Sequence, residues 1–493
     1  MPEQPLIVIV GGGIAGLSTA LALKDLAAGR PERPAPRLLV LEAEARCGGK
    51  IATARESGYV CEWGVNGFLN KEPRTLELCQ RLGLEDRLLP ASGAFNKRYI
   101  FTRGKLRPVH MHPLKFLFSG LLPFGAKVRL LREPWVRERA PEGDESIASF
   151  ARRRIGPIAA EVLVDSMQTG IYAGDFEQLS VRSCFPRVVE VERQYGSLIR
   201  GMLQLARERK AGAGAASGSG SGSGKEAGQR QLPGAGPSGH LTSFRGGMQV
   251  LIEALTGALG EVVRLGAPVR SLGVLEGRLA LELESGQAPL RAEAVVLACP
   301  AHAAARVTAG LDAELSSELA AVPYPPMAVV CLGYPVAQLR RPVDGFGFLA
   351  PRSAGLRILG ALWASATFPD NAPDGHVLIR AMLGGARDLT VLDLDDDELV
   401  RLVAGELERA QGAVGPPSFA RVFRHPLAIP QYQVGHEERL GRIEARAARL
   451  PGLFLAGNAY RGIGVNDCAR QAWPVAEAVL ARLTAGGPSR AGQ

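Results

Sequence analysis

A glycine-rich stretch near the amino terminus has the residue types and spacing of a phosphate-binding turn. Gly11, Gly13 and Gly16 form a G-x-G-x-x-G pattern. In this pattern the first glycine allows a tight turn, the second lets the backbone approach a pyrophosphate, and the third lets a helix pack closely on a strand. The amino end of that helix offers free N–H groups and a partial positive charge to the phosphates. The same glycines also suit an ordinary helix-capping turn, so the surrounding elements decide between the two.

Those elements fit a dinucleotide-binding unit. Leu6–Val10 is an apolar run that predicts a buried strand, and Ile14–Ala28 consists mostly of helix-forming residues. Residues 38–41 predict a second strand that ends at Glu42, whose carboxylate can accept hydrogen bonds from a ribose hydroxyl pair. Because strand, helix, strand and acid follow in this order, we favour dinucleotide binding over a capping turn.

Composition limits the class of protein. The 493 residues suffice for two or three domains, and a hydrophobic content of 46% is that of a globular chain. The net charge of +9 comes from basic residues that are scattered rather than clustered, which does not favour nucleic-acid binding. An arginine-biased composition is one explanation of this charge, and attraction to an anionic membrane surface is the other.

The cysteines and the amino-terminal residues indicate a cytoplasmic location. Seven cysteines without a C-x-x-C pair predict reduced thiols, and His110 and His112 lack the further ligands that a metal site needs. The first strand begins within a few residues of Met1, which leaves no room for a signal peptide. Residues 116–126 are uncharged but too short to span a bilayer, so they suit a membrane interface or the wall of an apolar cavity.

Several further motifs resemble those of one flavoprotein family. Residues 42–50 combine an acid, a small residue, an arginine and a Gly-Gly pair, as in flavoproteins whose FAD lies extended through a Rossmann-like domain. Residues 62–68 resemble the flavin-contacting turn of the same proteins, with Val65 where proline is commonest. The more specific motifs are residues 165–175, 179–180, 184–186, 345–349, 429–432, 435–436 and 457–468. Together they make the chain, over residues 6–483, similar to the oxygen-dependent protoporphyrinogen oxidase family of monoamine-oxidase-like flavoproteins.

The resemblance implies an α/β fold with a Rossmann-like FAD-binding domain, a sheet-plus-helix substrate domain and an inserted helical domain. The expected boundaries are 1–92, 241–305 and 440–485 for the discontinuous FAD-binding domain, 93–210 for the helical domain and 306–439 for the substrate-binding domain. The helical domain is also the part expected to associate with a membrane, if any part does. Residues 211–239 consist largely of Gly, Ser and Ala and predict a disordered loop.

The resemblance also implies non-covalent FAD. A helix that begins at Val465 or Asn466 directs N–H groups and its positive end towards the N1 and C2 carbonyl of the flavin, where the reduced ring carries negative charge. Cys468 falls inside that helix and is not expected to anchor the flavin covalently. The cofactor-binding residues that the family motifs imply are Gly11, Gly12, Gly13, Ile14, Ala15, Gly16, Glu42, Ala43, Arg46, Gly49, Lys50, Gly64, Val65, Asn66, Gly67, Val269, Asn458, Ile463, Gly464 and Val465.

The implied reaction is the oxidation of protoporphyrinogen IX to protoporphyrin IX in three hydride transfers to the flavin, with O2 reduced to H2O2 each time. We find no acid–base pair and identify no catalytic residue, since positioning the macrocycle against the flavin supplies most of the effect. Arg98 is expected to grip a substrate propionate, Phe346 and Leu349 to enclose the macrocycle, and Gly170 to approach a pyrrole face. The alternatives are a surface arginine and ordinary core packing.

Other functions stay open at this point. Coproporphyrinogen III is the nearest alternative substrate. It carries four carboxylates where protoporphyrinogen carries two, and the sequence alone distinguishes poorly between an enzyme for one and an enzyme for the other. An FAD amine oxidase needs paired aromatic residues, whereas the carboxyl-terminal motif offers only Tyr460. A carotenoid desaturase would lack residues 172–175 and 429–432, and a flavin-free prenyl-protein-escort module would not need Glu42. The expected partners are the porphyrinogen and O2, with a homodimer, handover to ferrochelatase and contact with the inner face of the cell membrane as open options.

Overall fold

The structure is a computed structural model that describes residues 4–30, 35–110, 112–136, 143–216 and 239–485. Residues 217–238, most of the predicted loop, lie outside this part of the chain. Residues 211–216 of that prediction are helical, because they continue α10 (Leu198–Ala216). None of the helices within the described residues is both long enough and apolar enough to cross a membrane.

A five-stranded parallel sheet forms the centre of one half of the molecule, in the order β10-β2-β1-β14-β20. Its strands are β1 (Leu6–Val10), β2 (Arg37–Leu41), β10 (Val263–Arg264), β14 (Ala294–Leu297) and β20 (Leu453–Leu455). Along β1, Ile7 and Ile9 pack into one apolar cluster, whereas Val8 and Val10 pack into another. Both faces of the sheet are therefore buried, as the continuous apolar run predicts.

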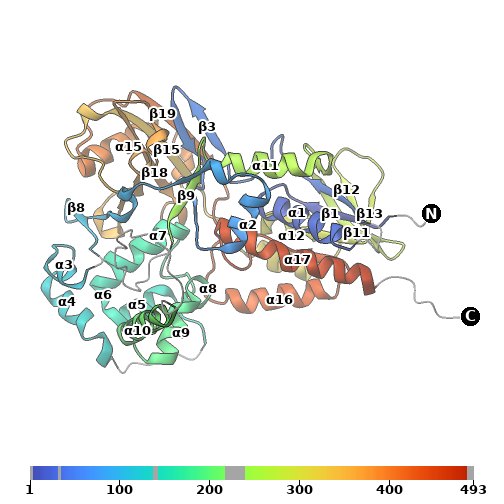
Figure 1. Ribbon diagram of the computed structural model, residues 1–493, viewed down its shortest axis with the longest axis horizontal. Helices are drawn as coiled ribbons and strands as arrows, with labels where there is room; N and C mark the ends of the chain where they lie inside the picture. Colours follow the sequence, from blue (N-terminus) through green and yellow to red (C-terminus); the bar gives the residue numbers. More distant parts are fainter. Residues whose placement is uncertain (1–3, 31–34, 111, 137–142, 217–238, 486–493) are drawn as a thin grey trace, which may run out of the picture.

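Helices cover one face of this sheet, and helices with a small sheet cover the other. The first face carries α1 (Ile14–Ala28), α11 (Gln249–Leu259) and α17 (Val465–Ala485), of which α1 and α17 lie side by side (Figure 1). The second face carries α12 (Ala301–Thr308), α13 (Ala313–Ala320), α16 (His436–Ala448) and the sheet β11 (Val269–Leu275), β12 (Arg278–Leu283) and β13 (Leu290–Ala292). The predicted first strand and the helix after it are confirmed.

A seven-stranded sheet forms the second half, in the order β19-β15-β18-β17-β16-β7-β8. Its strands are β7 (Arg98–Thr102), β8 (Lys105–Pro108), β15 (Met327–Pro335), β16 (Gly347–Leu349), β17 (Ile358–Trp363), β18 (His376–Gly384) and β19 (Phe419–His425). Side chains of α15 (Asp396–Gln411) share its apolar core. Because β7 pairs with β16, this sheet includes residues that the sequence-based division placed with the helices.

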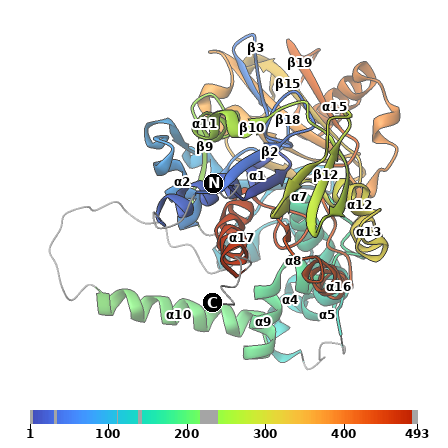
Figure 2. The same ribbon diagram turned by 90° about the vertical axis from the view of Figure 1, so that its right-hand side faces the viewer.

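A group of further helices lies below this sheet, at the end of the molecule farthest from the two termini in Figure 1. They are α3 (Pro113–Phe118), α4 (Phe124–Leu131), α5 (Ile147–Ile155), α6 (Pro157–Ala159), α7 (Ser166–Tyr172), α8 (Val181–Cys184), α9 (Pro186–Tyr195) and α10, with a single π-helical turn, η4 (Ala160–Asp165), just before α7. Figure 2 shows α10 extending away from the other helices. Glu133, which is fully buried, accepts hydrogen bonds from Ser197 Oγ and from the N–H groups of Leu198 and Ile199, so it fixes the start of α10.

Short strands connect the two halves. β3 (Thr53–Glu56) pairs with β4 (Tyr59–Glu62), and β9 (Leu241–Phe244) pairs with both β5 (Phe68–Leu69) and β6 (Leu88–Pro90). α2 (Pro73–Arg81) follows β5. Residues 63–67 connect β4 to β5.

Candidate functional site

The glycine turn lies at the carboxyl end of β1, and its geometry requires glycine at two positions. Gly11 has φ +111°, and a Cβ on it would lie 3.0 Å from the backbone of Ala298. A Cβ on Gly16 would lie 2.0 Å from the carbonyl oxygen of Gly11, so α1 could not pack this close to the strand. A Cβ on Gly13 would meet nothing within 4 Å, so the turn presents open backbone there.

Glu42 joins this turn to the segment after β2. Its Oε2 accepts a hydrogen bond of 2.7 Å from the Gly12 N–H, and its Oε1 accepts one of 2.9 Å from the Glu44 N–H. The Gly48 N–H donates to the Gly12 carbonyl at 2.8 Å. The Ala267 N–H donates to the carbonyl of Glu42, which brings the start of β11, with Val269, towards the same edge of the sheet.

Two cationic side chains lie beside the glycine turn. The guanidinium of Arg46 donates to the carbonyls of Cys47 and Gly49 and lies 4.5 Å from the ring centre of Trp63. Burial and the charge of Arg46 lower the pKa of Lys50. A Cβ on Gly49 would lie 3.9 Å from Gly13 Cα, so the segment that carries these two cations adjoins the open backbone. The arrangement suits a ligand that carries a pyrophosphate.

The turn at residues 62–67 is held by side chains from distant elements. Arg380, on β18, donates to the carbonyl of Glu62 at 3.0 Å and to that of Gly64 at 2.6 Å. His425, at the end of β19, has its Nε2 3.0 Å from the carbonyl of Trp63, and burial lowers its pKa to about 4. A neutral His425 therefore donates this bond. Arg380 and His425 supply a restraint on the turn where Val65 replaces the commoner proline.

Glu62 anchors the same turn from its other side. Its Oε1 accepts a bond of 2.7 Å from the Met248 N–H, and its Oε2 accepts one of 2.8 Å from Thr53 Oγ1. Burial raises the pKa of this carboxyl group to about 7. Asn66 differs, because its side-chain Oδ1 and Nδ2 are both buried and have no hydrogen-bond partner among the described residues. An amide in that state can bind the polar edge of a ligand.

The carboxyl-terminal turn follows β20 and leads into α17. Tyr432 donates its hydroxyl proton to the carbonyl of Asn458 at 2.6 Å, and Gly464 N–H donates to Asp467 Oδ2 at 3.1 Å. Val465 begins α17, as predicted. Cys468 lies one turn into that helix, and burial raises the pKa of its thiol to about 12, which disfavours the reactive thiolate.

Fifteen of the twenty predicted cofactor residues follow strands β1, β2 and β20, at the carboxyl ends of these strands. Gly11, Gly12, Gly13, Ile14, Ala15 and Gly16 follow β1, Glu42, Ala43, Arg46, Gly49 and Lys50 follow β2, and Asn458, Ile463, Gly464 and Val465 follow β20. Gly64, Val65, Asn66 and Gly67 lie between β4 and β5. Ligands of parallel α/β sheets bind at the carboxyl ends of the strands. The open backbone at Gly13, the two cations and the unpartnered Asn66 fit FAD.

The four predicted substrate residues lie on or beside β7, β16 and α7. Arg98 is paired with Gly347 in the parallel pairing of β7 with β16, and its Cζ lies 4.8 Å from the ring centre of Phe95 and 5.9 Å from that of Phe346. Burial lowers the pKa of Arg98, and no carboxylate pairs with it in the described chain. A Cβ on Gly170 would lie 2.9 Å from Leu349 Cδ2, so α7 touches β16.

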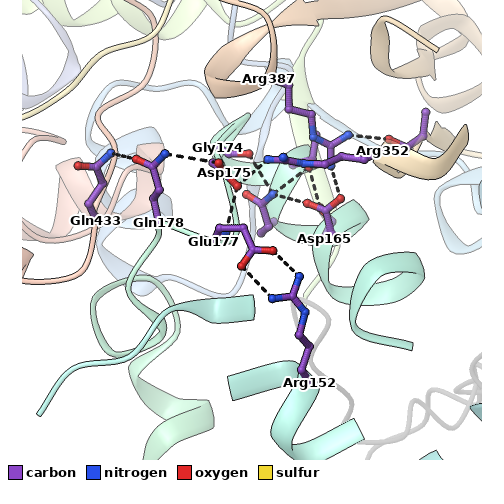
Figure 3. Close-up of polar contacts among 12 residues, drawn as sticks. Arg152, Asp165, Gly174, Asp175, Glu177, Gln178, Arg352, Arg387 and Gln433 are labelled. Carbon is purple, nitrogen blue, oxygen red and sulfur yellow. Dashed lines mark hydrogen bonds and ion pairs between the residues drawn. The ribbon is translucent and has the colours of Figure 1, made fainter. Parts of the chain in front are cut away.

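A polar network fixes α7 against the seven-stranded sheet (Figure 3). Arg387 bonds to the fully buried carboxylate of Asp165 and donates to Thr169 Oγ1 at 2.6 Å and to the carbonyl of Ala350 at 3.0 Å. Gln168 Nε2 donates to Asp165 Oδ1 at 2.9 Å and to the carbonyl of Gly174 at 3.1 Å. Around them Figure 3 shows three surface pairs, Arg352 with Asp175, Arg152 with Glu177, and Gln433 with Gln178.

Sequence reasoning missed the side chains that support the site. Arg380, Arg387 and His425 belong to no motif, and each acts on residues about 200 to 360 positions away along the chain. Asp165 and Tyr432 stand inside motifs that were used only for the resemblance. Their near-complete burial and polar character are the signals that could have identified them, but burial is not visible in a single sequence.

Comparison with known proteins agrees with the motifs. The family described as flavin containing amine oxidoreductase matches residues 14–480. The coproporphyrinogen III oxidase of Bacillus subtilis is 31% identical, with 94% of this chain and 96% of that protein covered. The protoporphyrinogen oxidase of Homo sapiens is 34% identical, with 96% of this chain and 98% of that protein covered. The solved structure of an Exiguobacterium protein provisionally named protoporphyrinogen oxidase has a TM-score of 0.80 and 27% identity, and covers 98% of this chain and 99% of its own.

These findings confirm the expected α/β flavoprotein fold, and they make the chain an oxidoreductase that uses a flavin. They also confirm the resemblance drawn from the motifs. The chain belongs to the protoporphyrinogen oxidase family within the flavin-containing amine oxidoreductases.

Proposed function

We propose that the chain is an FAD-dependent oxidase that converts protoporphyrinogen IX to protoporphyrin IX in haem biosynthesis. Three two-electron oxidations remove six electrons and six protons from the substrate, and three O2 molecules are reduced to H2O2. FAD, held without a covalent bond, supplies the hydride acceptor. The relatives are named as oxidases of porphyrinogens, and these names support this class of substrate.

The observation that carries the proposal is the setting of Arg98. Its guanidinium lies against the rings of Phe95 and Phe346 and has no acidic partner within the described residues. A desolvated guanidinium binds a carboxylate through two parallel, charge-assisted hydrogen bonds. Leu349 lies two positions along β16 from Gly347, the partner of Arg98, and its side chain covers the backbone of Gly170. A wide apolar ring with a propionate at its rim matches both features.

The chain's own residues act by binding and orientation. Arg98 fixes one rim of the macrocycle, and the contact of Gly170 with Leu349 sets where α7 can approach its face. Orientation of a reactive, electron-rich substrate supplies a large part of a rate enhancement without a general base. We therefore assign positioning roles to these residues and no proton-transfer role.

Coproporphyrinogen III is the second candidate substrate. The Bacillus subtilis and Staphylococcus aureus relatives, 31% and 30% identical, are named for that substrate, and identity alone does not separate them from the human relative at 34%. The residue pattern at Phe346 and Leu349 resembles that of enzymes for protoporphyrinogen, and it therefore favours protoporphyrinogen over coproporphyrinogen. An amine oxidase is disfavoured, because Tyr460, the one aromatic residue of the carboxyl-terminal motif, is buried.

Anaerobic reduction of the flavin in the purified protein tests the substrate. Protoporphyrinogen IX and coproporphyrinogen III are added in parallel, and the visible absorbance of the flavin is followed. We expect rapid bleaching by protoporphyrinogen alone. Bleaching by both would make coproporphyrinogen an equal substrate, and bleaching by neither, with flavin present, would overturn the proposal.

We further propose that α3 and α4 contact an anionic membrane surface, on the inner face of the cell membrane. Leu114 and Phe118 lie four residues apart on α3, and Phe124 and Leu131 seven apart on α4, so each pair shares a helix face. Phe118 is 85% exposed and Phe124 80%, and Trp135 just beyond α4 is 72% exposed. Lys115 and Arg132 are exposed beside them. Apolar side chains with flanking cations are typical of interfacial membrane contacts. Release of the apolar product there would suit handover to ferrochelatase.

Vesicle sedimentation tests this contact. We expect the protein to sediment with vesicles that contain anionic lipid and to lose most of this binding in the double variant Phe118→Ser/Phe124→Ser. Val274→Ser/Leu389→Ser is the matched control, because these two residues are also exposed, at 60% and 66%, but lie elsewhere. Equal loss in both double variants would contradict a membrane site on α3 and α4.

A further inference from the structure

The motif at residues 429–436 contains four buried residues, Pro430, Gln431, Tyr432 and His436, which lie between three parts of the fold. Tyr432 is 1% exposed and His436 is 3% exposed. Their rings are stacked, with centres 4.1 Å apart and an angle of 14° between the planes. His436 begins α16. Two stacked polar rings at such depth need hydrogen-bond partners, and these partners show what the motif does.

Both rings bond to the backbone of the carboxyl-terminal turn. Tyr432 Oη donates to the carbonyl of Asn458 at 2.6 Å, and His436 Nε2 lies 3.1 Å from the carbonyl of Tyr460. Because a carbonyl only accepts, His436 donates from Nε2. Its Nδ1 is buried and has no partner among the described residues, which matches a neutral ring with the proton on Nε2. The carbonyls of Asn458 and Tyr460, two positions apart in the turn, are thus held by one stacked pair.

The same motif bonds to the segment around α7. Gln431 Nε2 donates to the carbonyl of Tyr172 at 2.9 Å, and the Ser180 N–H donates to the carbonyl of Tyr432 at 2.8 Å. Gln433 donates to Gln178 at 2.7 Å, a contact visible in Figure 3. Ile463, in the carboxyl-terminal turn, packs against the apolar cluster that contains Tyr172 and Tyr432. The motif therefore links the turn before α17 to the helix that carries Gly170.

We propose that Tyr432 and His436 are positioning residues for the flavin, because they fix the turn at residues 458–464 on which it rests. In a trans peptide the C=O and N–H groups point in opposite directions, so a held carbonyl also fixes the direction of the next N–H. Restraint of the Asn458 and Tyr460 carbonyls thus orients the N–H groups of Ala459 and Arg461. This inference relies on the proposed FAD site but not on the identity of the substrate.

The variant Tyr432→Phe tests the proposal, because it removes one hydroxyl and retains the ring that stacks on His436. Loss of one buried hydrogen bond corresponds to about a three- to tenfold change in an equilibrium constant. We expect the Kd of apoprotein for FAD to rise by about this factor, and the midpoint potential of the bound flavin to fall, since a looser turn stabilises the reduced ring less.

Tyr172→Phe is the matched control. Its hydroxyl bonds to the carbonyl of Cys184 at 3.4 Å, within the same apolar cluster but away from the turn. We expect this control to leave both the FAD Kd and the flavin potential unchanged. His436→Gln, which keeps one side-chain N–H, is expected to perturb them less than His436→Leu.

Two outcomes overturn the proposal. In the first, Tyr432→Phe changes the melting temperature of the apoprotein but leaves FAD Kd and flavin potential at the wild-type values, which is the behaviour of a purely structural hydrogen bond. In the second, the wild-type chain does not bind FAD, and the proposed function fails with it. Normal FAD binding without bleaching by a porphyrinogen would overturn only the substrate assignment.

Discussion

Arg98 combines a positive charge with apolar surroundings, and this combination makes a sharp kinetic prediction. Its guanidinium lies 4.8 Å and 5.9 Å from the centres of two phenylalanine rings that contact each other. A bidentate carboxylate bond of about 1.5–3 kcal/mol corresponds to a rise in KM of about ten- to one-hundredfold in Arg98→Ala, with kcat little changed. Steady-state kinetics with protoporphyrinogen would measure this. The KM of Arg98→Lys should lie between those of the wild type and Arg98→Ala. Arg103→Ala, at an exposed arginine, is the control. An unaltered KM in Arg98→Ala would reject the role.

Glu62 makes a prediction about pH. Burial raises the pKa of its carboxyl group from 4.5 to about 7, so the folded chain keeps a proton that the unfolded chain releases between these values. The contribution of this group to stability is complete below pH 4.5 and decreases as the pH rises through this window. Glu62→Gln removes the titration, so its melting temperature relative to wild type should rise from pH 5 to pH 8.

The control for that measurement is Glu56→Gln, since Glu56 is exposed on the same hairpin. This variant should follow the wild-type pH dependence. If the melting temperature of Glu62→Gln also follows the wild-type pH dependence, the carboxyl group of Glu62 is ionised in the folded chain from pH 5 to pH 8.

At the scale of residues, the sequence was informative where chemistry is local. The glycines, Glu42 and Arg46 form a local pattern, because a turn that approaches a phosphate needs particular residue types within a few positions. Arg380 could not be predicted, since it acts on the carbonyls of Glu62 and Gly64 from more than 300 positions away. One arginine among many gives no local sign of such a contact.

At the scale of elements, the ion pair between Arg387 and Asp165 ties the helix α7 to the edge of the seven-stranded sheet. Asp165 is fully buried, so removal of the guanidinium leaves a buried charge without its partner. We expect Arg387→Met to lower the free energy of unfolding by about 3–5 kcal/mol. Adding Asp165→Asn should restore part of this loss, because the uncompensated charge is removed. Chemical denaturation measures both.

Arg357→Met provides the control at this scale. Arg357 pairs with Asp388 at a more exposed position, and such pairs contribute about 1 kcal/mol or less. If Arg387→Met is no more destabilising than Arg357→Met, the buried pair does not hold α7 in place.

The sequence predicted the first strand and the helix after it, but not the partners that distant strands find. β7 and β8 flank the turn at Gly104. Their membership of the seven-stranded sheet was not predictable, because the parallel pairing of Arg98 with Gly347 joins distant parts of the chain. The π-helical turn before α7 also gave no sign in the sequence. This turn ends at Asp165, whose carboxylate bonds to Arg387 from a distant part of the chain.

At the scale of the whole molecule, the two sides of residues 217–238 interleave rather than form separate bodies. β1 and β2 precede this segment, yet they share a sheet with β10, β14 and β20, which follow it. β7 and β8 likewise join five strands from the second part. The covalent link through residues 217–238 is therefore one connection among many, and their Gly, Ser and Ala composition offers little apolar surface to bury.

The chain should accordingly tolerate a break in this segment. We expect residues 1–216 and 239–493, expressed together as two chains, to assemble into a complex that keeps its flavin through gel filtration and has near wild-type turnover. The extensive burial between the two parts drives this assembly, since it buries both faces of the five-stranded sheet. A break after Val330, inside β15, is the control and should prevent assembly, because it divides a strand that pairs with both β18 and β19. Loss of flavin from the first pair would show that residues 217–238 contribute to the fold.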